Sequence, residues 1–171
     1  MSLTSEIIDS VRTGLGTDWP ATLYRDRVRS QRTRAFALDL DPREHRTAIL
    51  HTLLGIELKA GNRRINCPDL GTARYLQVFA RIGCASCAVP YDITKISPIA
   101  DDLETAWQKS VILLEKAASD RSAPVRGRIR AALAAELRRE IAEIGAGAAI
   151  PEFRQSTKQR GEREKSGKGQ E

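Results

Sequence analysis

The segment 69–91 constrains the fold most, because a helix with clearly marked ends is followed at once by a short apolar stretch. Asp69 is a typical helix N-cap, apolar residues repeat at helical spacing from 70 to 82, and Gly83 is a typical helix stop. Residues 84–91 are mostly apolar and are followed by a turn signal, which predicts a short buried strand. A helix that leads directly into such a strand indicates an α/β fold.

Three patterns precede this segment and predict a helix and two strands. Residues 3–15 repeat apolar side chains at helical spacing, with Ser2 or Thr4 as the N-cap. Residues 21–30 and 34–41 alternate with a period of two, which predicts two strands, the first of them at the edge of a sheet.

The segment 47–60 fits more than one structure, because its apolar residues suit both periods. The first alternative is a strand, with Leu54, Ile56 and Leu58 on one face. The second is a helix that starts near residue 42, and the third is a helix to about residue 53 followed by a strand. Turn signals on both sides of a short segment at 63–66 favour the strand over residues 55–60.

Two helices are predicted near the C-terminus, at residues 97–119 and 125–144, each started by a proline. Residues 146–171 are rich in Lys, Arg, Glu, Gln, Gly and Ser, so we expect a disordered charged tail. The prediction is one α/β domain over residues 1–145. Its core has the order α-β-β-β-α-β, with a small mixed sheet flanked by helices and extra C-terminal helices.

Charge and composition bear on the partner and the compartment. The formal net charge is +6 and arginine supplies most of it, which favours a polyanionic partner such as nucleic acid. The longest apolar runs fall short of a membrane span, and the N-terminus has no basic segment followed by an apolar one. We therefore expect a cytoplasmic protein without a membrane partner.

A pair of charged residues on the third predicted strand indicates metal chemistry. Glu57 and Lys59 are two residues apart, so a strand places both on one face, and Asp39 or Asp41 from the neighbouring strand can join them. Two carboxylates, Asp39 and Glu57, can hold a Mg²⁺ ion that activates water for attack on a phosphodiester. A desolvated lysine such as Lys59 can orient or deprotonate that water.

At these residues the sequence resembles the PD-(D/E)XK nuclease superfamily, over about residues 3–93. The resemblance is carried by Asp39, by Glu57-Leu58-Lys59, and by the helix and strand that follow. It implies a helix, three strands, a helix and a strand, and magnesium-dependent hydrolysis of phosphodiester bonds. Glu6 in the first helix matches an auxiliary acidic position of some members.

Arg25, Arg27 and Arg29 share one face of the predicted strand at 21–30, and they are the predicted contacts to phosphates. A sheet edge protected by charge explains them equally well. The expected function is nucleic-acid binding with magnesium-dependent cleavage. The alternative is a non-enzymatic regulatory or assembly protein that binds a protein partner through its C-terminal helices.

Overall fold

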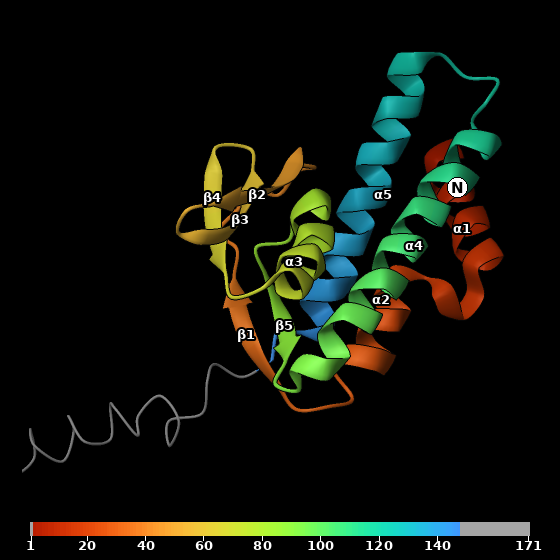
Figure 1. Cartoon of the computed structure of the whole chain (residues 1–171). Helices are drawn as coiled ribbons and strands as arrows, with labels where there is room; N and C mark the ends of the chain where they lie inside the picture. Colours follow the sequence, from red (N-terminus) through yellow and green to blue (C-terminus); the bar gives the residue numbers. More distant parts are fainter. Residues whose placement is uncertain (1, 148–171) are drawn as a thin grey trace, which may run out of the picture.

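The computed structural model of the protein describes residues 2–147 (Figure 1). Its first element is helix α1, Leu3–Leu15. Ser2 is its N-cap, and the Ser2 hydroxyl accepts a hydrogen bond from the Ser5 amide at 3.2 Å. The apolar residues that repeat at helical spacing, Ile7, Ile8, Val11 and Leu15, are the buried ones. The predicted first helix is therefore confirmed.

The predicted strand at residues 21–30 is wrong, because this segment is helical. A short 3₁₀ turn, Gly16–Asp18, leads into α2, Pro20–Leu23, and the chain continues as a π-helical turn, Tyr24–Val28. Pro20 occupies a first-turn position of α2, where its fixed φ suits a helix. Tyr24 and Val28 are four residues apart and both fully buried. They lie together on the inward face of a helix, and this spacing explains why the sequence seemed to alternate as a strand does.

Strands β1, Thr33–Ala37, and β5, Ser86–Pro90, form a two-stranded antiparallel sheet. Both correspond to predicted strands, and each is shorter than its sequence pattern. β5 is almost entirely buried, whereas most of β1 is half-buried. The far edge of β5 is occupied by tyrosine hydroxyls, since Tyr24 accepts a hydrogen bond from the Ala88 amide and Tyr75 donates one to the Ala88 carbonyl.

Strands β2, Thr47–Thr52, β3, Gly55–Ala60, and β4, Arg63–Cys67, form a separate antiparallel meander. The strand alternative for residues 55–60 is confirmed, and the helical alternatives for residues 47–53 are wrong. The two halves of the segment fold back on each other through a turn at Leu53 and Leu54. A single long strand was not distinguishable from this hairpin by period alone, because both place alternate residues on one face.

The α/β class is confirmed, and its strands divide into two antiparallel sheets in place of the one mixed sheet that the element order predicted. Helix α3, Leu70–Ile82, has Asp69 as its N-cap and Gly83 as its C-cap, as predicted. It lies between the β2–β4 meander on one side and the long helices on the other (Figure 1).

Helix α4, Ile93–Ala117, and helix α5, Ala123–Ile144, pack against α1 and α3 (Figure 1). α4 begins four residues before the predicted start at 97, because Asp92 caps it by accepting a hydrogen bond from the Thr94 amide at 3.0 Å. Pro98 consequently lies within the helix. No helix within residues 2–147 is both long and apolar enough to cross a bilayer. Most of the predicted tail lies outside the described residues.

Candidate nucleic-acid interface

The β2–β4 meander has one face against the core and one face in solvent. The buried face carries the cross-strand row Ile49, Leu58 and Ile65, which packs toward α3. Glu57 and Lys59 are on the opposite face, as the two-residue spacing predicts. Lys59 is exposed, whereas Glu57 is half-buried because Arg64 of β4 lies over it.

Asp39 is not on a strand next to β3. It follows β1 in the other sheet, where its backbone has a φ of 54° and its amide donates to the Ala85 carbonyl at 3.1 Å. Its carboxylate lies 3.4 Å from Arg63 Nη2. Arg63 pairs with the buried Ala60, so it belongs to the opposite face of the meander from Glu57. The structure therefore brings Glu57 and Lys59 together without Asp39.

The predicted magnesium ligands do not fit a shared metal ion in this arrangement. Each carboxylate already has an arginine partner, Arg63 for Asp39 and Arg64 for Glu57 at 3.3 Å. Within residues 2–147 no cluster of three or more Asp, Glu, His or Cys side chains is placed to bind a metal. The geometry consequently supports no metal-activated water beside Lys59.

Arg25, Arg27 and Arg29 do not form the predicted phosphate-binding face, because the segment is helical. Residues two apart on a helix point in different directions. Arg25 pairs with Asp26 at 3.0 Å, Arg27 pairs with Asp102, and Arg29 Nη1 donates to the Thr33 hydroxyl at 2.8 Å. The structure therefore assigns each of the three a separate partner.

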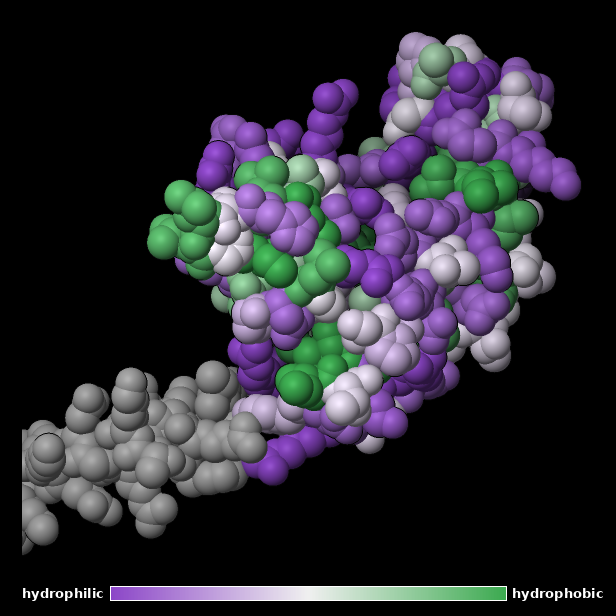
Figure 2. Space-filling view, in the orientation of Figure 1, coloured by the Kyte–Doolittle hydropathy of each residue, from purple (hydrophilic) through white to green (hydrophobic). Residues whose placement is uncertain are grey.

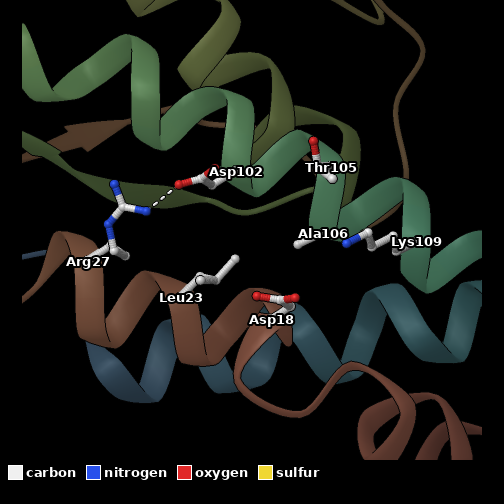
Figure 3. Close-up of a pocket in the computed structure, with 7 residues that line it drawn as sticks. All are labelled: Asp18, Leu23, Arg27, Asp102, Thr105, Ala106 and Lys109. Atoms are coloured by element: carbon white, nitrogen blue, oxygen red, sulfur yellow. Dashed lines mark hydrogen bonds and ion pairs between the residues drawn. The ribbon is translucent and has the colours of Figure 1, made fainter.

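Arg27 lines a surface cavity of about 310 Å³ between the 18–27 segment and α4 (Figure 3). Figure 3 shows Arg27 and Lys109 at opposite ends, with Asp102 bound to Arg27 and the Asp18 carboxylate between the two ends. Two basic and two acidic side chains thus line the cavity. A balanced set of charges gives no net attraction for a phosphate.

Four basic residues gather instead at one end of the meander, beside the β3–β4 turn. Lys59 and Arg64 are directly opposite each other on the solvent-facing side, and Arg63 lies at the same end on the other face of the sheet. The Gly61 amide donates to the Arg46 carbonyl at 3.0 Å, which holds Arg46 at the same end. All four residues are exposed. We call this set, Arg46, Lys59, Arg63 and Arg64, the basic end of the meander.

Sequence reasoning found only Lys59 of these four residues. The other three belong to no motif. The β3–β4 hairpin places Arg63 and Arg64, and the segment between β1 and β2 places Arg46 beside Gly61. One signal was present: Arg63 and Arg64 follow Gly61-Asn62, a turn dipeptide, so a hairpin places them across from Ala60 and Lys59.

Comparison with known proteins does not assign the chain to a family: no family model, curated protein or solved structure matches it. The resemblance to the PD-(D/E)XK nucleases therefore stays a prediction.

Proposed function

We propose that the protein binds nucleic acid through the basic end of the meander. The observation that carries the proposal is the pairing of Lys59 with Arg64, two positive side chains directly opposite each other on an uncovered sheet face. Like charges at opposed positions destabilise a sheet, whereas a bound phosphate between them would stabilise it.

The surrounding charges extend this attraction over the whole end of the sheet. Arg63 and Arg64 are partly neutralised by Asp39 and Glu57, and both guanidinium groups are exposed enough for solvent and ions to compete with these carboxylates. Within the described chain no ion pair is found for Lys59 or Arg46. A polyanion gains more from such a cluster than a single anion does, because each added phosphate contact releases a counterion.

Duplex nucleic acid suits this surface better than a single strand. Binding of single strands relies on exposed aromatic side chains, on which the bases stack. Trp19, Tyr24, Tyr75 and Trp107 are buried, and the solvent-facing side of the meander carries no aromatic residue within the described strands. The basic end therefore offers contacts to a phosphate backbone rather than to unstacked bases.

The proposal is one of binding, without the cleavage that the family resemblance implies. Asp39 and Glu57 are held apart by separate arginines, so the chain does not offer two free carboxylates beside Lys59. Binding through phosphates needs neither a metal nor a nucleophile.

The test is a measurement of duplex affinity by fluorescence anisotropy over a range of salt concentrations. The double variant Lys59→Gln/Arg64→Gln removes two charges and leaves an amide able to donate to Glu57. Two lost phosphate contacts should lower the slope of log K against log salt by about two, and weaken binding roughly tenfold to a hundredfold near 0.1 M salt.

The matched control is Lys116→Gln/Arg128→Gln, which removes the same charge from exposed positions on α4 and α5. The control should retain the wild-type slope. Equal losses in the two variants would mean that only net charge matters, and the basic end would then have no special role.

Assembly through the C-terminal helices is a second candidate, favoured by the exposed Ile112 of α4. This side chain lies at the rim of a cavity of about 360 Å³ lined also by Trp107, Val111 and Arg130. If α4 mediates self-association, light scattering should show a dimer that Ile112→Ser converts to a monomer. A wild-type protein that stays monomeric at high concentration would contradict this candidate.

A further inference from the structure

The β2–β3 hairpin presents two leucines to solvent at its tip. Leu53 and Leu54 are fully exposed, and neither contacts the hydrophobic core. Figure 2 shows apolar atoms at the outermost point of the meander, where the β2–β3 turn lies in Figure 1. Burial of a leucine side chain is favourable, and these two leucines gain nothing from it within the described chain.

The turn that carries these leucines is well defined. The Thr52 hydroxyl accepts a hydrogen bond from the Leu54 amide at 3.2 Å and donates one to the Gly55 carbonyl at 3.0 Å. Gly55 has a φ of +126°, a conformation that other residues rarely adopt. Hairpin turns are ordinarily built from polar residues and glycine. The tip is therefore a hydrogen-bonded apolar projection whose two leucines add nothing to the core.

We propose that this tip inserts as an apolar wedge between base pairs of duplex DNA, while the basic end of the meander contacts phosphates. The inference rests on the proposed nucleic-acid binding and specifies its geometry. β3 runs the six residues from the tip to the basic end, which is about 17 Å at strand spacing. That length equals about five base-pair steps, so one duplex can contact both ends of the sheet.

Charge placement favours DNA over a lipid bilayer as the partner of the tip. The first charged side chain behind the tip on the solvent-facing side is the acidic Glu57, and the basic end begins two residues farther along, about 17 Å from the tip. If the tip entered a bilayer to a depth of about 5–10 Å, the basic end would lie about 7–12 Å above the headgroup boundary, roughly one screening length at physiological salt, so its attraction to anionic headgroups would be weakened. Phosphates of a duplex, in contrast, continue along the sheet.

Insertion of apolar side chains has a structural signature in the DNA. Wedging a base step unstacks it and kinks the duplex by about 20–90°. Backbone contacts by the basic end alone do not unstack a base step, so a kink caused by the wedge depends on the two leucines. The bend angle therefore separates the wedge from simple electrostatic binding.

The experiment measures energy transfer between dyes at the two ends of a short duplex, at saturating protein, together with anisotropy for affinity. The test variant is Leu53→Ser/Leu54→Ser, and the matched control is Ile93→Ser, which removes an exposed apolar side chain at the start of α4. Wild-type protein and the control should shorten the end-to-end distance. The leucine variant should bind within about tenfold of wild type and leave the duplex straight.

The outcomes for the wedge and for the proposed function are distinct. Saturated binding with no bend by wild-type protein, or equal bending by the leucine variant, would overturn the wedge and leave nucleic-acid binding intact. Absence of any binding at low salt would overturn both. Wild-type protein that sediments with phosphatidylserine vesicles through its leucines, without bending DNA, would identify a lipid partner and likewise overturn the wedge.

Discussion

The Tyr24 hydroxyl accepts a hydrogen bond from the backbone amide of Ala88 at 2.8 Å and so satisfies the far edge of strand β5. The same hydroxyl donates to the Gly145 carbonyl at the end of α5 at 2.6 Å. Tyr75 completes the edge by donating to the Ala88 carbonyl at 2.5 Å. The β1–β5 sheet is thereby closed on this side by two side chains, without a third strand.

Replacing Tyr24 by phenylalanine should lower the free energy of unfolding by about 2 kcal/mol or more, because it leaves the Ala88 amide and the Gly145 carbonyl without their partner. Tyr75→Phe removes one hydrogen bond and should cost about half as much. Urea denaturation measures both. Equal effects of the two variants would show that the bond to Gly145 contributes nothing.

The protein should lose stability at alkaline pH. Burial raises the pKa of Cys84 to about 12, and burial also raises the pKa of Cys87 and Tyr75. An unfolded cysteine loses its proton near pH 8.5, while the folded state still holds it. The stabilisation is therefore complete below about pH 8.5 and falls as pH rises toward 12, by up to about 1.4 kcal/mol per pH unit for each group.

Urea denaturation under reducing conditions at a series of pH values from 7 upward tests this dependence. Cys84→Ala should make the curve shallower in the alkaline range, since one group with a raised pKa is gone. A free energy of unfolding that stays constant above pH 9 would contradict the prediction.

Replacement by alanine should have opposite effects on stability at two glycines. Gly83 caps α3 with a φ of +88°, and an added Cβ would lie 1.9 Å from the Arg43 carbonyl oxygen. Gly83→Ala should therefore cost about 3 kcal/mol or prevent folding. Gly127 lies within α5 with open space around it, so Gly127→Ala should stabilise by about 0.5–1 kcal/mol. Thermal denaturation compares the two.

A charged cluster joins α1 to α5. Arg12 contacts both Glu140 oxygens, at 2.7 and 3.2 Å, and its guanidinium lies 4.3 Å from the centre of the Trp19 ring. Trp19 Nε1 also donates to Glu140 at 3.1 Å. Glu140→Gln should lower the melting temperature by several degrees, corresponding to about 1 kcal/mol. Glu143→Gln, which alters an exposed pair with Arg139, should change it little.

Nucleic-acid binding should not depend on divalent metal ions. Since Asp39 and Glu57 are engaged by Arg63 and Arg64, addition of excess EDTA at constant ionic strength should leave the duplex affinity unchanged. A loss of affinity that Mg²⁺ restores would show that the two carboxylates come together on a metal, and would revive the predicted nuclease site.

Local signals in the sequence were enough for most helices and strands. The ends of α3 at Asp69 and Gly83 could be predicted, because an N-cap and a left-handed C-cap are properties of single residues. The error at residues 21–30 has an equally local origin. Tyr24 and Val28 suit either period. The exposed arginines between them, Arg25 and Arg27, completed a false alternation of buried and exposed residues.

The candidate site was harder to predict from the sequence, because it depends on which strands pair. Glu57 and Lys59 share a face by spacing alone, and this was predicted correctly. The position of Asp39 depends on β1 pairing with β5 rather than with the meander, a choice made between residues far apart in the chain. The exposure of Leu53 and Leu54 likewise follows from the hairpin, since leucine as a residue type is usually buried.

The division into two sheets has a consequence for the order of folding. The meander pairs residues close in sequence, whereas β1 pairs with β5 across the interval from Thr33 to Pro90. Closing that long loop costs more chain entropy than closing either hairpin. We therefore expect β2, β3, β4 and α3 to form first, and the β1–β5 ribbon to be completed last. Amide hydrogen exchange in pulse-labelled refolding protein should protect Leu58 before Ala88.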